Sequence, residues 1–385
     1  MNGVRNRELN RLIEAAIQSF DIPEDLYRLA VRRYEAAGRW LTARAQVRGM
    51  TREVYPQGSF RLGTVVRPLG AEAQYDIDMV DRRDVDKSSI SQAKLKADVG
   101  EDLEAYLLTS PNGQPRLEEG KRCWTLLYRT DPFHMDVLPA IPDPDGRANS
   151  ILLTDRDVRA WQHSNPIDYA GWFHRTMAEE FAQLRELKLA EMAAGDVEDV
   201  PDWTIKTTLQ RSVQALKRHR DLRFLNREAQ KPASIIITTL AAQSYRGGGS
   251  LYDVLADVTE RMPSFIECRG GVWWVPNPVQ PEENFADRWG ERPELASAFF
   301  EWLDRARTDF IAIGSERGLD KAVGALSRGF GDDSGQAAAK SFGSGFTSAS
   351  QTGRLGVVSA VGALGTTPRY RAPRHTFHGD DAFPE

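Results

Sequence analysis

The sequence predicts an α+β fold of two lobes, in which a mixed β-sheet with N-terminal helices precedes a mostly helical lobe. Apolar residues at helical spacing occupy the N-terminus, β-branched and aromatic runs broken by Gly and Pro follow, and helical patterns return from Pro166 onward. Near residue 328 the composition changes to mostly Gly, Ser and Ala, which offers little apolar area for folding. We therefore expect an N-terminal lobe over 1–165, a helical lobe over 166–328 and a flexible tail over 329–385.

Within the first lobe, the periodicity predicts helices over 7–19, 23–44 and 90–108. Pro23, followed by Glu24 and Asp25, is a typical helix start. Strand-like runs are EVYPQGSF, GTVVRP, QYDIDMVD, RCWTLLYR and FHMDVLPAI, of which the last two are typical of paired strands. The second lobe is expected to hold helices over 166–194, 203–229, 233–245, 251–262 and 292–313.

Composition narrows the functional class. The 385 residues are 41% apolar and 27% charged, with a net charge of −5, so a buried core is expected and non-specific nucleic-acid binding is not. The two cysteines, Cys123 and Cys268, are too far apart in sequence for a CxxC zinc site and too few for a disulfide scaffold. No apolar run is long enough for a membrane helix, and the N-terminus lacks a secretory leader, so we expect a cytoplasmic protein with no membrane partner.

Asp76 and Asp78 are the strongest candidates for chemistry. Four Asp-x-Asp pairs occur in the chain, and most such pairs are solvated turns or helix caps. This pair lies in YDIDMV, whose alternation puts both carboxylates on one face of a strand and the apolar side chains on the other. Adjacent carboxylates repel each other unless a divalent cation lies between them, which makes the spacing suitable for Mg²⁺.

Two further features surround this pair. Gly58-Ser59 forms a turn upstream that can offer backbone N–H groups and a hydroxyl to a phosphate. Asp136, in FHMDVLPAI, lies on a second apolar strand, where a carboxylate is costly unless it is paired or ligated. Three aspartates on neighbouring strands beside a phosphate-binding turn predict two-metal phosphoryl or nucleotidyl transfer.

The order GS, DxD and third Asp resembles the polymerase-β-like nucleotidyltransferases. More specifically, the chain resembles the bacterial CD-NTases, the cGAS/DncV-like cyclic-oligonucleotide synthases of CBASS anti-phage systems. The resemblance covers roughly residues 1–315, through the segments QGSFRLGTVVRP, YDIDMV, HMDVLPAIP, NPIDYAGWF, LQRSVQALKRHRD, KPASIIITTLAA and VPNPVQPEENFADRW.

This resemblance implies a polymerase-β-like catalytic lobe and a role for each motif. Asp76 and Asp78 would hold two Mg²⁺ ions, with Mn²⁺ as a possible substitute, and Asp136 would complete one metal site. Gly58 and Ser59 would hold the triphosphate of the donor nucleotide, and Lys217 and Ser234 match a lysine and a serine that the family places against it. The substrates would be ATP or other NTPs, and the product a cyclic di- or trinucleotide that a separate effector reads in anti-phage defence.

The residues around Lys217 have a simpler interpretation too. Lys206, Gln210 and Lys217 fall within about 40° on a helical wheel, beside an apolar stripe. The basic cluster KRHRD could equally be a solvated helix end, and we interpret Arg218, Arg220 and Arg223 as mainly surface residues. His134 is interpreted as a packing residue or an outer neighbour of the site.

Two other functions remain open at this stage. The same fold could add nucleotides to RNA or another acceptor, although the acidic balance disfavours a basic groove. A non-catalytic nucleotide-binding module is the second, although such a module has no need of three clustered carboxylates. The tail over 329–385 could be handled by operon-encoded conjugation enzymes, bind a regulatory partner, or pack on its own domain.

Overall fold

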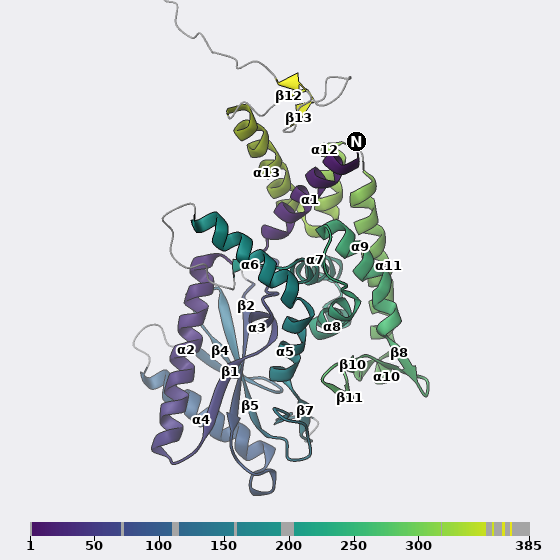
Figure 1. Ribbon diagram of the computed structural model, residues 1–385. Helices are drawn as coiled ribbons and strands as arrows, with labels where there is room; N and C mark the ends of the chain where they lie inside the picture. The colour runs from purple at the N-terminus through teal and green to yellow at the C-terminus, as the bar shows by residue number, and fades with distance from the viewer. Residues whose placement is uncertain are drawn as a thin grey trace, which may run out of the picture. The chain divides into compact units, whose positions relative to one another are not determined.

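The computed structural model (Figure 1) describes residues 2–70, 73–109, 115–157, 160–193, 204–316 and 318–351, and the short segments 356–357, 364–365 and 370–371. Two compact units are present, one formed by residues 20–312 and the other by residues 1–19 with 313–385. The expected boundary between lobes near residue 165 lies inside the larger unit. None of the described helices has the length and apolar character needed to cross a membrane.

A seven-stranded mixed sheet forms the centre of the larger unit. Its main order is β1-β2-β5-β4-β3, while β6 pairs with β5 and β7 pairs with β6. The pair β2–β5 is parallel and the other described pairs of this sheet are antiparallel. The strands are β1 (Arg52–Pro56), β2 (Tyr75–Arg83), β3 (Arg116–Glu119), β4 (Trp124–Leu127), β5 (Phe133–Pro142), β6 (Ile151–Leu153) and β7 (Gln162–Ser164).

Two long helices, α2 (Glu24–Val47) and α4 (Gln92–Thr109), pack against one face of this sheet. The core between them takes Ile77 and Met79 from β2 and Met135 and Val137 from β5, all with side chains that are almost fully buried. The alternation expected for YDIDMV is therefore present, and the intervening polar residues of β2 and β5 point to the opposite face.

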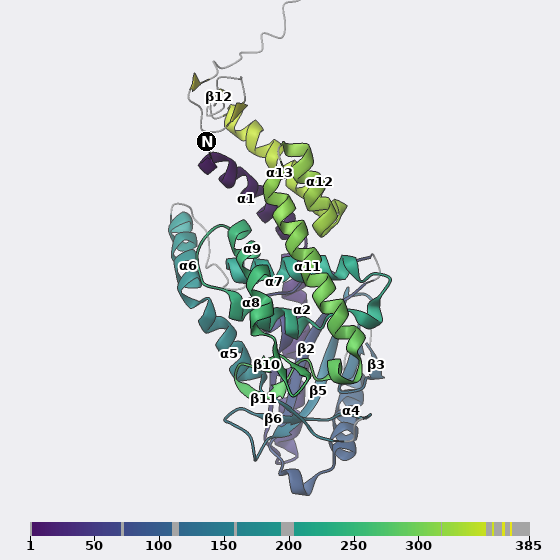
Figure 2. The ribbon, with the colours of Figure 1, turned by 90° about the vertical axis from the view of Figure 1, so that its right-hand side faces the viewer.

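Helices that follow the sheet form the rest of this unit (Figure 2). The segment expected as one helix over 166–194 is divided at Met177, which ends the first of two helices. Helices α7, α8 and α9 contact one another, and two short hairpins precede α11. The elements are α5 (Pro166–Thr176), α6 (Ala178–Ala193), α7 (Thr208–Arg223), α8 (Ser234–Ser244), α9 (Leu251–Arg261), β8 (Glu267–Arg269), β9 (Val272–Trp274), β10 (Pro276–Asn277), β11 (Gln280–Asn284), α10 (Arg288–Glu291) and α11 (Pro293–Ser315), with 3₁₀ turns at Lys87–Ser89, Glu228–Gln230 and Met262–Phe265.

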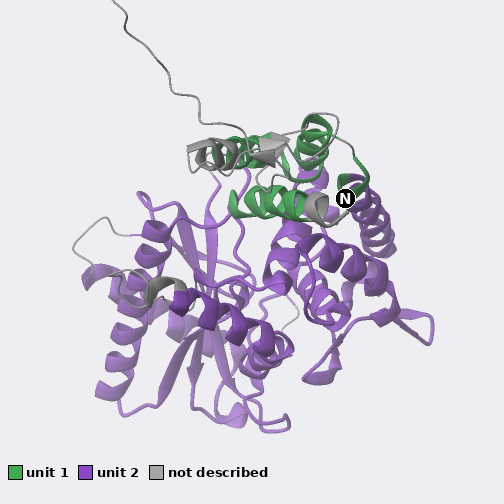
Figure 3. Cartoon of the chain, turned by 45° about the horizontal axis from the view of Figure 1, so that its top comes forward, with its two compact units in different colours: residues 1–19, 313–385 green, residues 20–312 purple. Residues whose placement is uncertain are grey.

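In the smaller unit (Figure 3), residues 332–351 of the segment expected to be a flexible tail form a helix. Helices α12 (Leu319–Phe330) and α13 (Asp332–Gln351) pack against each other and against α1 (Asn2–Gln18). Ala338 is fully buried, and a side chain at Gly335 would overlap Ser327. The small residues Gly335 and Ala338, which suggested a linker, therefore allow close helix packing. Short strands β12 (Gly356–Val357), β13 (Leu364–Gly365) and β14 (Tyr370–Arg371) follow, and most of the remaining tail lies outside the described residues.

Candidate active site

Four polar side chains form a two-by-two array on the parallel strands β2 and β5. Asp76 is paired with His134, and Asp78 with Asp136. Because these positions alternate with the buried apolar residues, all four side chains lie on the face away from α2 and α4. Ligating atoms of Asp76, His134 and Asp136 all lie within 4.8 Å of one another. The structure thus brings together the three aspartates identified in the sequence and places His134 directly beside them.

The array concentrates negative charge. Burial, together with the carboxylates of Asp76 and Asp136, raises the pKa of Asp78 to about 8. Asp136 is oriented by Thr125 on β4, whose hydroxyl donates a 2.6 Å hydrogen bond to Asp136 Oδ1. Three carboxylates presented side by side by fixed strands are a donor set suited to a hard divalent cation.

Gly58 connects this array to the preceding strand. It begins the five-residue helix α3 (Gly58–Leu62) with φ of +64°, a conformation that favours glycine. A Cβ at this position would overlap Asp78 Oδ2 and lie 3.2 Å from Asp78 Cγ. The backbone N–H of Gln57 donates to the carbonyl of Asp78 at 2.9 Å, which fixes this approach. Gly58 therefore lies against Asp78, and Ser59 lines the same cavity as Asp76 and Asp78.

The segment after α3 does not form the strand that we expected for GTVVRP. It is held instead by polar side chains on and just before α7, which donate hydrogen bonds to its carbonyl oxygens. These bonds run from Lys206 to Gly63 (2.8 Å), Gln210 to Leu62 (2.9 Å), Gln214 to Val65 (2.7 Å), Lys217 to Thr64 (3.3 Å) and Arg218 to Arg67 (2.7 Å). The polar face of α7 therefore ties the helical part of the unit to the segment that carries Gly58 and Ser59.

Lys217 lines a cavity of about 590 Å³, together with Ser59, Asp76, Asp78 and Ser234. Its ammonium group is buried and donates to the Thr64 hydroxyl at 3.1 Å. Burial, and then the neighbouring positive charge of Arg220, lowers the pKa of Lys217 to about 7.

The basic end of α7 is solvated only in part: Arg223 is exposed, as expected. Arg218 and Arg220 are both buried, which corrects our interpretation of them as surface residues. Arg220 lines the same cavity and donates to Ser234 Oγ at 2.8 Å and to the Pro232 carbonyl at 3.0 Å. Arg220 was not identified from the sequence because the run KRHRD is typical of an exposed helix end. The available signal was that Arg220 lies two helical turns after the buried residue Val213, and therefore on the same side of α7.

Buried contacts with α11 fix the orientation of α7. His219 Nδ1 accepts a 3.0 Å hydrogen bond from Trp302 Nε1, and His219 Nε2 lies 3.1 Å from Asp309 Oδ2. Because an indole nitrogen can only donate, Nε2 of the neutral imidazole carries the proton and donates to Asp309. Burial would raise the pKa of Asp309, but this bond and the charges of Arg223 and Arg305 lower it to about 2.

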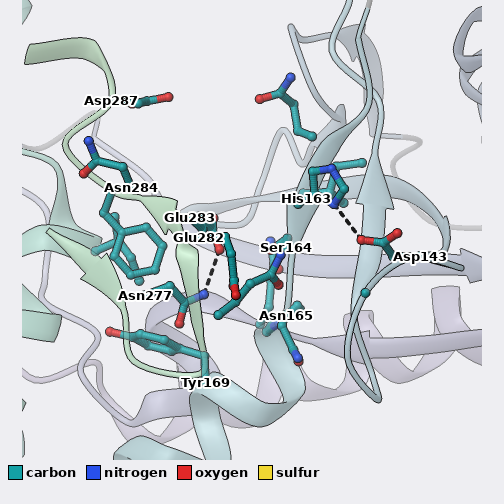
Figure 4. A pocket seen from close by; sticks show the side chains of 18 of the residues that line it. Asp143, His163, Ser164, Asn165, Tyr169, Asn277, Glu282, Glu283, Asn284 and Asp287 are labelled. Atoms are coloured by element: carbon teal, nitrogen blue, oxygen red, sulfur yellow. Dashed lines mark hydrogen bonds and ion pairs between the residues drawn. The ribbon is translucent and has the colours of Figure 1, made fainter. Parts of the chain in front are cut away.

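A second and larger cavity of about 1190 Å³ adjoins the first and shares Gly58, Leu62 and Ile235 with it (Figure 4). Figure 4 shows its two polar walls. On one, Asn277 donates to Glu283 at 2.7 Å; on the other, His163 Nδ1 lies 2.6 Å from Asp143.

The ring of Tyr169 also lines this cavity, and burial raises the pKa of Glu283. None of the residues on these two walls was identified from the sequence as functional. The signal available was their position within or close to HMDVLPAIP, NPIDYAGWF and VPNPVQPEENFADRW, three of the segments that carry the resemblance.

Comparison with known proteins points to one family. Residues 52–139 match the model of the nucleotidyltransferase domain of cyclic GMP-AMP synthase DncV-like proteins. The chain is 30% identical over 305 residues to a c-di-GMP synthase of Roseivirga ehrenbergii, covering 78% of each protein. It is also 31% identical over 299 residues to the cyclic dinucleotide synthase CdnG of Bradyrhizobium diazoefficiens, covering 73% of this chain and 70% of CdnG.

The fold agrees with the sequence comparison. The solved structure of the Bradyrhizobium diazoefficiens CD-NTase CdnG in complex with GTP superposes with a TM-score of 0.67 and 26% identity. The match covers 88% of this chain and 99% of that one. It therefore extends over the sheet and the helices after it, as well as over the region that the family model matches.

Proposed function

The chain belongs to the CD-NTases, a family of nucleotidyltransferases, and from this membership we propose that it condenses GTP into a cyclic dinucleotide with release of pyrophosphate. The observation that carries the proposal is the face of β2 and β5, where Asp76, Asp78 and Asp136 lie together beside Gly58 and Ser59. GTP is favoured because one relative is a c-di-GMP synthase and the CdnG structure contains GTP.

The donor set fits a pair of Mg²⁺ ions held by Asp76, Asp78 and Asp136. Burial, and then the neighbouring carboxylates of Asp76 and Asp136, raise the pKa of Asp78, and a divalent cation would favour its ionised form. When bound, such ions supply positive charge to the phosphates of the substrate and to the leaving pyrophosphate. Thr125 keeps one oxygen of Asp136 oriented within the array.

The smaller cavity is the proposed place of the donor triphosphate. Gly58 and Ser59 would contact it at one side, while Lys217 and Ser234 line the cavity at another. A triphosphate beside Lys217 would favour the ammonium form, so the lysine would bind its phosphate more strongly than its low pKa in the free protein suggests. Arg220 would act through Ser234, to which it donates a hydrogen bond.

The larger cavity is the proposed place of the nucleosides. Its volume of about 1190 Å³ exceeds the range of about 300–1,000 Å³ typical of sites for one small ligand, so it suits two nucleosides. Glu283 and Asn277 supply a carboxylate and an amide on one wall, and a carboxylate can accept from both N–H groups on the Watson–Crick edge of guanine. Adenine presents an acceptor at the corresponding ring nitrogen.

A product assay tests the proposal against its two alternatives. The purified protein is incubated with Mg²⁺ and labelled GTP, ATP, CTP and UTP, alone or with RNA, and the products are treated with phosphatase and identified by mass spectrometry. We expect a phosphatase-resistant dinucleotide ring that contains guanine. Extended RNA would instead support an RNA-directed transferase, and an absence of pyrophosphate release would support a binding module.

We further propose that the enzyme acts in the cytoplasm and that its product activates a separate effector during phage infection. Family membership supports this role. The test is phage plating on cells that carry the complete operon, compared with cells in which Asp76→Asn and Asp78→Asn are introduced together. Equal protection in both would contradict the proposed role while leaving the product assay unaffected.

A further inference from the structure

His134 occupies one corner of the two-by-two array, where the other three corners are aspartates. It lies two residues before Asp136 on β5 and directly beside Asp76 on β2. Both strands are interior strands of the sheet, with partners on each side, so the position of the imidazole relative to the carboxylates is fixed by the backbone. His134 is about a quarter exposed, on the face that carries the site.

The separation between His134 and Asp76 fits two ligands of one ion. His134 Nε2 lies 3.4 Å from Asp76 Oδ1, a distance that allows an ion pair when the imidazole is protonated and is also close to the spacing of two ligands of one ion. Two adjacent ligands of an octahedral ion with bonds of about 2.1 Å are separated by about 3 Å. Asp136 also places a carboxylate oxygen within 4.8 Å of both atoms. One nitrogen and two oxygens therefore lie close enough together to be ligands of one ion.

The chemistry of this set differs from that of three carboxylates. Mg²⁺ binds oxygen ligands almost exclusively, whereas Mn²⁺ and other first-row transition metals accept imidazole nitrogen as well. Replacing one oxygen by nitrogen therefore shifts relative affinity towards the transition metals.

We propose that His134 is a direct ligand of the ion held by Asp76 and Asp136, and that it makes this site favour Mn²⁺ over Mg²⁺. The inference rests on the metal site of the proposed function. It adds a ligand and a metal preference that the three aspartates alone do not imply.

Electron spin echo envelope modulation of the full-length protein loaded with Mn²⁺ tests the ligand directly. We expect modulation from a coordinated ¹⁴N nucleus in the wild type and its loss in His134→Gln. His163→Gln is the matched control, because His163 lies on the wall of the larger cavity beside Asp143 and should leave the ¹⁴N signal intact.

Competition binding gives a second readout that does not depend on catalysis. The electron paramagnetic resonance spectrum gives the fraction of free Mn²⁺, from which the Mn²⁺ affinity and, by competition, the Mg²⁺ affinity are obtained. His134→Gln should bind Mn²⁺ roughly tenfold more weakly, which is the scale of losing one partner at a metal site. Its Mg²⁺ affinity should change less, so the Mn²⁺/Mg²⁺ ratio falls.

The outcomes separate the two proposals. Mn²⁺ that binds the wild type without ¹⁴N modulation, or with a Mn²⁺/Mg²⁺ ratio unchanged in His134→Gln, overturns the role of His134 and leaves the proposed function standing. Wild-type protein that binds neither ion in the presence of GTP overturns the metal site and the proposed function together. The wild-type spectrum decides the ligand even if the variant does not fold.

Discussion

Replacing Gly58 with alanine should damage the protein in two separable ways. The first is backbone strain, because a left-handed conformation costs a residue with a Cβ about 1–2 kcal/mol. The second is steric, because the new methyl group would overlap the Asp78 carboxylate. Moving that carboxylate off its preferred rotamer costs a further amount of about 0.5–1.5 kcal/mol. We therefore expect Gly58→Ala to lower the free energy of unfolding by about 1.5–3.5 kcal/mol.

Gly49 provides a matched control. Its φ of +68° is almost the same as that of Gly58, but a Cβ there would have nothing within 4 Å. Gly49→Ala should therefore show the backbone strain alone, and any gain from a stiffer unfolded chain is common to both variants. Urea unfolding of the metal-free proteins measures the difference. Gly58→Ala should also lose pyrophosphate release, while Gly49→Ala should keep it within about twofold of wild type, since surface changes are usually mild.

A double-mutant cycle tests the collision itself. Asp78→Ala removes the overlapping oxygen, so Gly58→Ala should cost less in that background than in the wild type, with a coupling of about 0.5–1.5 kcal/mol. Equal destabilisation by Gly58→Ala and Gly49→Ala, with no coupling to Asp78, would refute the argument that this glycine is required by its approach to the site.

Other predictions follow from the pKa values and packing. Since the folded pKa of Asp78, about 8, exceeds its unfolded value, metal-free protein should lose stability as pH rises from about 4 to 8, and thermal melts should show no such slope for Asp78→Asn. Lys217→Met should raise KM for GTP in a steady-state assay without lowering the melting temperature, because burial already disfavours the ammonium. The lowered pKa of Asp309, about 2, means that its stabilisation disappears as pH falls from about 4 towards 2, so Asp309→Asn should unfold at higher pH in an acid titration followed by circular dichroism. Truncation after Arg328 should keep synthesis within a few-fold but increase binding of a hydrophobic dye through exposure of α1 and α12, whereas truncation after Gln351 should not.

Much of the catalytic face could be predicted from local pattern. The alternation of YDIDMV identifies which residues of β2 are buried, and FHMDVLPAI does the same for β5. Placing Asp136 beside Asp78 follows from the expectation that the two apolar strands are neighbours. The break at Met177 could not be predicted because the helical pattern runs through it without interruption. The small hairpins could not be predicted because their strands are short and polar.

The remaining features depend on distant contacts. From the sequence, Arg220 is predicted to be a surface residue, because its neighbours in the chain do not indicate that it contacts Pro232 and Ser234. The carbonyls of GTVVRP are satisfied by side chains more than 140 residues away, which a β-propensity argument cannot anticipate. Residues 332–351 illustrate the reverse case, because small side chains favour an unfolded linker in isolation but permit close helix contacts once α1 and α12 are present.

The row of donors along α7 restricts how this part of the chain can vary in length during evolution. Gln210, Gln214 and Lys217 recur at helical spacing, and each meets one carbonyl of the segment from Leu62 to Val65. A single inserted residue between Gln210 and Lys217 would rotate every later donor by about 100° around the helix axis. It would also turn Lys217 out of its cavity and His219 away from α11. Homologous sequences should therefore align without gaps across α7, even where their side chains differ.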